Sequence, residues 1–303
     1  MTYLKLESLI LAAIQILDVF VCVLMSVAFY TLFERKILGL IQVRLGPNKV
    51  GMSGILQPFS DAMKLLSKTQ SSPVKSGLWG FLLAPTLSFL LSISIWMVFS
   101  SFCGTFSLNL CLFVVFMYLS LSAYPLIFAG WFSNSKYSSI GGIRSVALSL
   151  SYEIPLSFSI LGVVLMWKSP NPFYWGGSLM SGLVLSQIGM ILTIMICFLV
   201  ETGRSPFDLA EGESELVSGY CVEYGGGLYI LVFLSEYLAM FFSGLVISSM
   251  FLHSPFTIVA VVFASAWLRG TLPRIRFDLL MSTGWLVLIP LSMGLFFSNC
   301  ILQ

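Results

Sequence analysis

Long apolar runs without apolar–polar alternation dominate the chain. A bilayer core needs roughly 20 helical residues per crossing, and the runs divide into eight segments of about that length. The missing alternation favours helices over strands. We therefore predict an all-α fold, a polytopic membrane helix bundle of about eight transmembrane helices in a single membrane domain, 1–303. The predicted spans are 9–33, 78–99, 108–131, 146–166, 179–200, 226–249, 255–272 and 280–300.

The composition agrees with a membrane protein and argues against bound redox groups. Hydrophobic residues make up 58% and charged residues 9% of the 303 residues, whereas soluble domains carry about 25% charge. The six cysteines form no C-x-x-C pair, and the only histidine, His253, cannot supply two axial haem ligands. Because glycine-rich nucleotide motifs are also missing, we expect neither a metal nor a redox cofactor in this chain.

The basic residues are divided unequally between the two sides predicted by eight spans. Only Lys5 and Lys168 fall on one side, and the other 13 of the 15 lysines and arginines fall on the opposite side. This bias marks the cytoplasmic or matrix face, from which both termini point away. The predicted loops on this inner face are 34–77, 132–145, 201–225 and 269–279.

The first inner loop contains a predicted amphipathic helix. Ile55, Phe59, Ala62 and Leu66 recur at helical spacing, with Asp61 among the residues of the opposite face. We expect this short helix to lie in the plane of the membrane interface.

Acidic residues are the main candidates for chemistry. Glu153 and Glu236 fall inside predicted spans, where an ionisable group costs about 2.5–3.5 kcal/mol to insert. The alternative is an interhelical hydrogen bond. Acids in a low-dielectric bundle can bind and release protons near neutral pH, which suits a proton or cation path.

The third inner loop is acidic on an otherwise basic face. Its acids, which surround the single basic residue Arg204, are Glu201, Asp208, Glu211, Glu213, Glu215 and Glu223. A solvated surface loop is the alternative interpretation. Glu34 and Arg35 at the inner end of the first span suit either a site or an interfacial anchor. Asp18 is interpreted as a solvated helix end.

Several segments resemble the NADH–ubiquinone oxidoreductase chain 1 family of respiratory complex I. The most specific is ETGRSPFDLAEGESELVSG at 201–219. The others are FERKILG at 33–39 with Q-x-R-x-GPN at 42–48, QPFSDAMKL at 57–65, GW-x-SNS-x-Y at 130–137, SYE at 151–153 and PR-x-R-x-D at 273–278. The resemblance covers nearly the whole chain, from about 27 to 285.

The resemblance implies a subunit that forms part of the ubiquinone chamber and begins the proton path. Ubiquinone would be the substrate, while NADH, FMN and iron–sulfur clusters would be bound only by partner subunits. The residues expected at the quinone chamber are Glu34, Arg35, Arg44, Phe207, Asp208 and Arg274. The expected proton relay comprises Glu153, Glu201, Glu211, Glu213, Glu215, Glu223 and Glu236, with Arg204 compensating the acids.

The resemblance also implies partners and a location. The partners would be the peripheral-arm quinone-site subunits, adjacent small membrane subunits and membrane lipids, with no nucleic acid. The short termini favour a mitochondrially encoded chain, so we expect the mitochondrial inner membrane with both termini in the intermembrane space.

The chain departs from the family pattern at a few positions. Gly203 stands where asparagine is frequent, Ser205 replaces threonine, Leu148–Leu150 replaces Gln-Thr-Ile, and Leu286 replaces a basic residue. These changes leave every acid and arginine of the path in place, but weaken a role for side chains 149, 203 and 286.

Two rival functions are a membrane subunit of an energy-converting hydrogenase and a stand-alone cation or proton transporter. The transporter predicts inverted repeats, and the sequence contains no convincing repeat.

Overall fold

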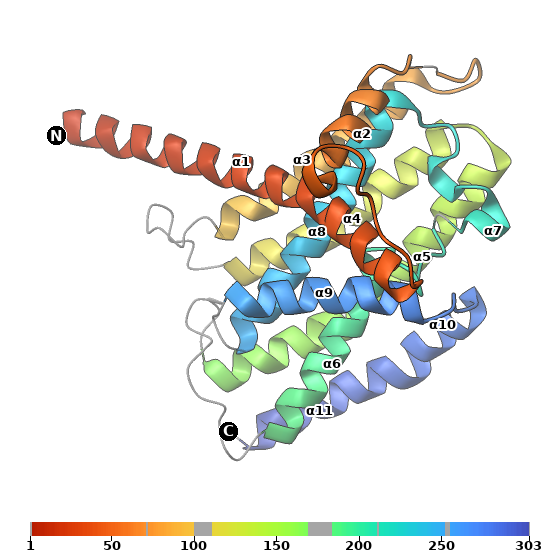
Figure 1. Ribbon diagram of the computed structural model, residues 1–303. Coiled ribbons are helices and arrows are strands. Elements are labelled where there is room, and N and C mark those ends of the chain that lie inside the picture. The colour runs from red at the N-terminus through yellow and green to blue at the C-terminus, as the bar shows by residue number, and fades with distance from the viewer. Residues whose placement is uncertain are drawn as a thin grey trace.

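The protein is a bundle of helices connected by loops (Figure 1). The computed structural model describes residues 2–70, 72–99, 111–168, 184–210, 212–251 and 255–302, and no strand occurs among them. The predicted all-α fold is therefore confirmed. The helices are α1 (Thr2–Ile41), η1 (Met52–Gly54), α2 (Gln57–Leu66), α3 (Leu78–Phe99), α4 (Cys111–Phe132), α5 (Lys136–Trp167), α6 (Val184–Glu201), α7 (Glu213–Leu216), η4 (Gly219–Cys221), α8 (Gly226–Phe251), α9 (Pro255–Thr271), α10 (Phe277–Thr283), the π-helical η5 (Gly284–Leu288) and α11 (Ile289–Leu302).

Six stretches of described helix are long and apolar enough to cross a membrane. They lie in α1, α3, α4, α5, α8 and the continuous segment from α10 to α11. Two shorter apolar helices, Ser186–Glu201 and Phe256–Thr271, coincide with the fifth and seventh predicted spans. The first five residues predicted for the fifth span, 179–183, lie outside the described residues.

The first helix is longer than the predicted span and contains part of the predicted loop. α1 extends to Ile41, so Glu34 and Arg35 lie on the helix and not in a loop. Glutamate, arginine, lysine, isoleucine and leucine at 34–38 all sustain helix, and the chain turns only where Val43 adopts a φ of 54°. The N-terminal half of α1 extends beyond the rest of the bundle (Figure 1).

The second predicted inner loop is mostly helical. α5 begins at Lys136, ten residues before the predicted span, because the Ser135 side chain caps it by accepting a hydrogen bond of 3.3 Å from the Ser138 amide. Gly130 of α4 and Gly142 of α5 face each other so closely that a Cβ on Gly130 would lie 3.0 Å from the Gly142 Cα. Small residues thus let the two helices pack tightly next to the connection 133–135.

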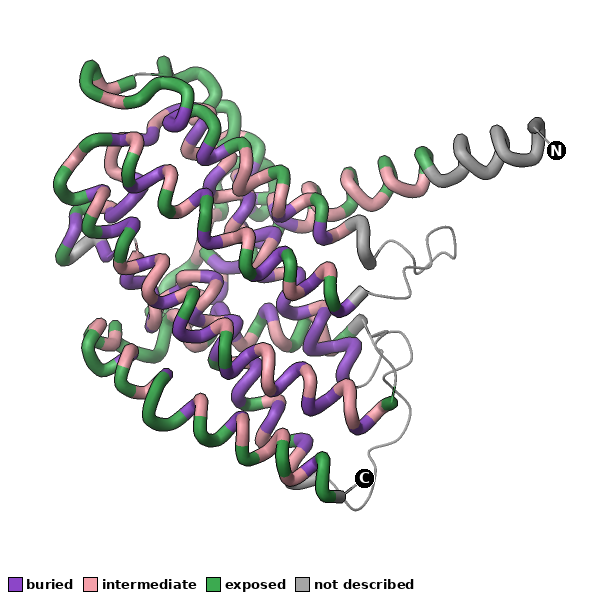
Figure 2. The backbone as a smooth tube through the Cα atoms, turned by 180° about the vertical axis from the view of Figure 1, so that it is seen from behind, coloured by how far each residue is buried: buried purple, intermediate pink, exposed green. Residues whose placement is uncertain are grey.

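The helices pack in an order that brings distant segments together. α3 contacts α4 and α8, α5 contacts α4, α6 and α11, and α9 contacts α1 and α8. Purple, buried positions in Figure 2 concentrate where these helices face one another. Large side chains such as Tyr152, Met190 and Phe242 fill the centre, and α2 contacts both α1 and α8, as expected for the short amphipathic helix.

Candidate functional site

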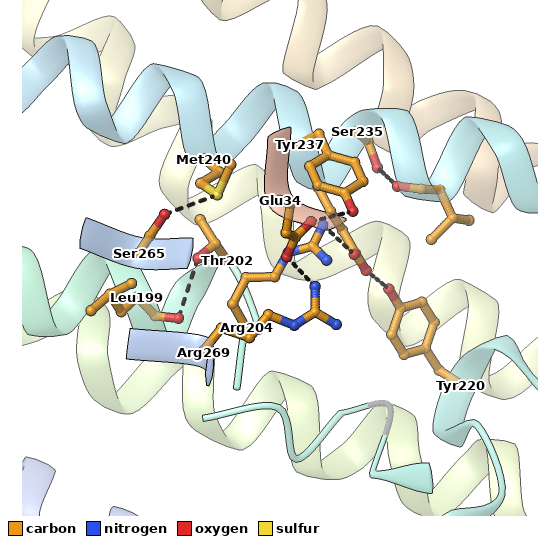
Figure 3. Close-up of polar contacts among 12 residues, drawn as sticks. Glu34, Leu199, Thr202, Arg204, Tyr220, Ser235, Tyr237, Met240, Ser265 and Arg269 are labelled. Atoms are coloured by element: carbon orange, nitrogen blue, oxygen red, sulfur yellow. Dashed lines mark hydrogen bonds and ion pairs between the residues drawn. The ribbon is translucent and has the colours of Figure 1, made fainter. Parts of the chain in front are cut away.

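A buried acid on the first helix bonds to two other helices. Glu34 of α1 has only 5% of its side chain exposed and forms an ion pair with Arg269 of α9. The Tyr237 hydroxyl of α8 donates a hydrogen bond of 2.9 Å to the other Glu34 oxygen. Glu34 therefore joins three helices through both of its carboxylate oxygens (Figure 3).

A second ion pair lies directly beside the first. An Arg204 nitrogen lies 3.4 Å from a Glu236 oxygen, and the Tyr220 hydroxyl donates a hydrogen bond of 2.7 Å to the other Glu236 oxygen. The Arg204 guanidinium also lies over the Tyr237 ring, with Cζ 4.1 Å from its centroid. Tyr237 thus contacts both ion pairs, and the charges form one network (Figure 3).

Two neighbouring cavities open around the acids of this region. One has a volume of about 100 Å³ and extends between α3 and α4, and the other, of about 70 Å³, extends to Phe207 and Ala210 of the acidic loop. Both contain room for several water molecules. Their shared lining consists of Leu126, Ser149, Glu201, Thr202, Tyr220 and Glu236.

Two of the predicted inner loops are tied to each other. Arg274 pairs with Asp208 at 3.2 Å, and the Ile275 amide donates a hydrogen bond of 3.1 Å to the Pro206 carbonyl. Asp208 is buried, while about a third of the Arg274 side chain is exposed. The loop after α9 therefore holds the acidic loop against the bundle.

A tyrosine near the start of α8 lies outside the cavities. Tyr224 stacks on Phe81, with ring centroids 4.3 Å apart and planes 3° from parallel. Burial raises the pKa of its hydroxyl well above the usual range, so the group stays neutral. Within the described part of the chain this hydroxyl has no hydrogen-bond partner.

Comparison with known proteins identifies the family. The family model described as NADH dehydrogenase matches residues 14–299. Curated relatives called NADH-ubiquinone oxidoreductase chain 1 include those of Aedes aegypti, 41% identical over 95% of both chains, and Locusta migratoria, 40% identical over 95% of both. The relative from Artemia franciscana is 45% identical over 90% of this chain and 93% of its own. The chain belongs to this family.

Membership in the NADH-ubiquinone oxidoreductase chain 1 family confirms the resemblance that the sequence motifs predict. The structure gives the surroundings of two residues that depart from the family pattern. Gly203 has a φ of 59°, a conformation that glycine and asparagine adopt most readily. Ser149 lines both cavities, so position 149 is part of the wall of the site.

The residues expected in the proton relay fall into two groups. Glu201 and Glu236 line the same cavities, and Glu153, one turn beyond Ser149 on α5, interacts electrostatically with Glu201. Glu215 instead pairs with Arg144 at 2.7 Å with half of its side chain exposed. Glu223 is only partly buried and lines neither cavity. Glu211 and the Glu213 side chain lie outside the described residues.

The six residues expected at the quinone chamber do not form one cluster within this chain. Glu34 belongs to the buried network with Arg269, whereas Arg35 is half exposed and pairs with Asp61 of α2 at 2.6 Å. Arg44 is exposed after the end of α1. Asp208 and Arg274 form their own pair, and Phe207 lines the smaller cavity.

Three further residues of the network were not assigned a role from the sequence. Arg269 looked like an ordinary inner-face basic residue, although its place at the end of an apolar run signals a need for a buried partner. Tyr220 and Tyr237 carry no charge, and only the fold shows that Tyr220 bonds to Glu236 and Tyr237 to Glu34. Among the residues that the structure describes, no three histidine, cysteine or acidic side chains lie close enough together to hold a metal ion.

Proposed function

We propose that this chain is a membrane subunit of NADH:ubiquinone oxidoreductase, complex I, that forms part of the ubiquinone chamber and starts the proton path. The names of its relatives support the assignment to this enzyme. The chain would be a multi-pass protein of the mitochondrial inner membrane, with both termini in the intermembrane space. Its partners would be peripheral-arm quinone-site subunits, small membrane subunits and lipids.

The single observation that carries the proton path is the position of two acids. Glu201 at the end of α6 and Glu236 in α8 line both cavities. One cavity reaches the acidic loop and the other reaches the space between α3 and α4. Because carboxyl groups exchange protons with water, these two acids link the loop side to the interior of the bundle.

The quinone chamber would be formed at the inner face. The Asp208–Arg274 pair fixes the acidic loop, and Phe207 packs beside it with an apolar ring. The partly exposed cations Arg35 and Arg274, together with the exposed Arg44, are available to peripheral-arm subunits or to the quinone head group. Partner subunits would complete the chamber.

Coupling would proceed through electrostatics. Electrons from NADH would reach ubiquinone through the FMN and iron–sulfur clusters of partner subunits, and each ubiquinone takes up two electrons and two protons to become ubiquinol. The changing charge at the quinone would be felt by the acids of the loop, among them Glu201 and Glu211. Their proton affinities would change, and Glu153 and Glu236 would take up or release protons in response.

Replacement of Arg274 tests the quinone side of the proposal. Arg274→Ala should lower NADH:ubiquinone reductase activity, because the acidic loop loses its ion pair and the chamber a cation. NADH oxidation by an artificial acceptor should be unchanged, since the flavin lies in another subunit. Arg276→Ala is the matched control, because Arg276 is 82% exposed and its ion pair within the described residues is with the exposed Asp278. Equal loss of both activities in assembled Arg274→Ala enzyme would contradict the proposal.

A further inference from the structure

Tyr118 lines the larger cavity. The residue lies on α4 and only 9% of its surface is exposed. Its ring packs edge-on against Phe242 of α8, with centroids 6.0 Å apart and planes at 61°. This contact restricts the movement of the ring. Tyr118 shares the cavity with Glu201 and Glu236 and interacts electrostatically with Glu201.

The other hydroxyls around Tyr118 already donate to their own helices. Ser88 of α3 donates a hydrogen bond of 2.8 Å to the Pro85 carbonyl, and Ser122 of α4 donates one of 2.7 Å to the Leu119 carbonyl. Their oxygens remain free to accept hydrogen bonds. The Tyr118 hydroxyl, in contrast, makes no hydrogen bond to the described part of the chain, so its hydrogen can bond to water in the cavity.

The cavity itself is suited to water. Its volume of about 100 Å³ exceeds the ~15 Å³ that one water needs on the same measure. Pro85 and Pro125 line it from α3 and α4. Neither proline can donate a hydrogen bond to the carbonyl one turn earlier, so each helix offers a further acceptor near the cavity. Water there can bond to acids, to serine hydroxyl oxygens and to the phenol of Tyr118.

We propose that Tyr118 carries the proton path beyond Glu201 and Glu236 toward α3 and α4. This inference rests on the proposed function, since it extends the same path. The Glu201 carboxyl gives its proton to a water, and that water passes a proton on to the Tyr118 oxygen while the Tyr118 hydroxyl hydrogen moves to a second water on the side of Ser88 and Ser122. Glu201 is left as a carboxylate, and the second water carries the proton onward. The phenol remains neutral before and after, and one proton has moved.

Tyr118→Phe in the assembled complex, studied in inner-membrane vesicles, tests this role. The substitution keeps the ring and its packing on Phe242 and removes only the hydroxyl. Ubiquinone reductase turnover should fall about fivefold, because water fills the vacated space but is less well ordered. The ratio of turnover in H₂O to that in D₂O should rise, because a proton step then limits the rate. NADH oxidation by an artificial acceptor should stay constant.

Tyr224→Phe is the matched control. Its hydroxyl is also buried, but it lies outside both cavities and has no hydrogen-bond partner among the described residues. This variant should keep both the turnover and the isotope ratio of the unmodified complex. A change in turnover without a change in isotope ratio for Tyr118→Phe would indicate a packing role and overturn the inference.

Glu201→Gln measured in parallel separates this inference from the proposed function. If Glu201→Gln impairs turnover while Tyr118→Phe behaves like the unmodified complex, the acid path stands and the role of Tyr118 is wrong. If Glu201→Gln also leaves turnover and proton pumping unchanged, the proposed proton path itself fails.

Discussion

Tyr237 donates a hydrogen bond of 2.9 Å to Glu34, although 203 residues separate them in the sequence. The same ring lies beneath the Arg204 guanidinium. One side chain therefore connects the Glu34–Arg269 pair on α1 and α9 with the Arg204–Glu236 pair between the acidic loop and α8. In a low-dielectric interior, such a connection makes each pair sensitive to the charge of the other.

Removal of the Tyr237 hydroxyl should weaken this connection without disturbing the ring. Tyr237→Phe keeps the contact with Arg204 and takes one donor from a buried carboxylate, at a cost of about 1.5–3 kcal/mol. We expect lower ubiquinone reductase turnover and loss of activity at a lower temperature. Heat inactivation of assembled complex measures the second effect. If Tyr237→Phe is as stable and active as Tyr224→Phe, the hydrogen bond has no role.

The Glu34–Arg269 pair should behave as a coupled unit. Glu34→Gln leaves the Arg269 charge without its partner at a cost of about 2–3 kcal/mol, less than for a fully buried pair, because 33% of the Arg269 side chain is exposed. The double variant Glu34→Gln/Arg269→Gln should recover part of this loss. A double-mutant cycle on the heat stability of the complex measures the coupling. Purely additive losses would mean that the pair contributes no specific interaction.

The predicted membrane topology can be tested at the two ends of a single helix. Lys136 and Lys168 are both exposed and flank α5, whose 32 residues span roughly 48 Å. Single cysteines at these positions should be labelled by an impermeant reagent from opposite sides of the membrane, and the unsubstituted complex, in which Cys22 and Cys300 are exposed, gives the background labelling. We expect Lys136→Cys to react from the matrix side and Lys168→Cys from the intermembrane space. Labelling of both from one side would rule out the eight-span arrangement.

Sequence patterns predicted the helices more accurately than their connections. The apolar run 78–99 coincides with α3, because hydrophobicity sets the length of a membrane helix. The patterns did not indicate that α1 continues to Ile41 or that α5 starts at Lys136. The first extension begins with Glu34, Arg35 and Lys36, which favour helix, and the second follows the capping Ser135; hydrophobicity does not report either property.

The sequence identifies the charged residues of the site, but it does not show which of them form ion pairs with each other. Glu201 and Glu236 stand out as acids next to or within apolar runs, and they line the same cavities. That Glu34 pairs with Arg269, and Asp208 with Arg274, depends on how α1, α8 and α9 pack. Tyrosines such as Tyr237 act through hydroxyls that look like ordinary core aromatics in the sequence, so only the fold reveals them.

Proton pumping by Glu201→Gln and Glu236→Gln complexes tests the central claim most directly. Glutamine keeps the size and hydrogen-bonding capacity of the acid but cannot carry a proton, and the neutral amide is cheaper to bury than the charge, so assembly should survive. The measurement is the number of protons translocated per electron, together with ubiquinone reductase turnover, in sealed vesicles. We expect both variants to lose turnover and pumping together, because a blocked proton step stalls the electron step coupled to it. Normal turnover with a normal proton-to-electron ratio in both variants would contradict the relay and leave these acids with a structural role.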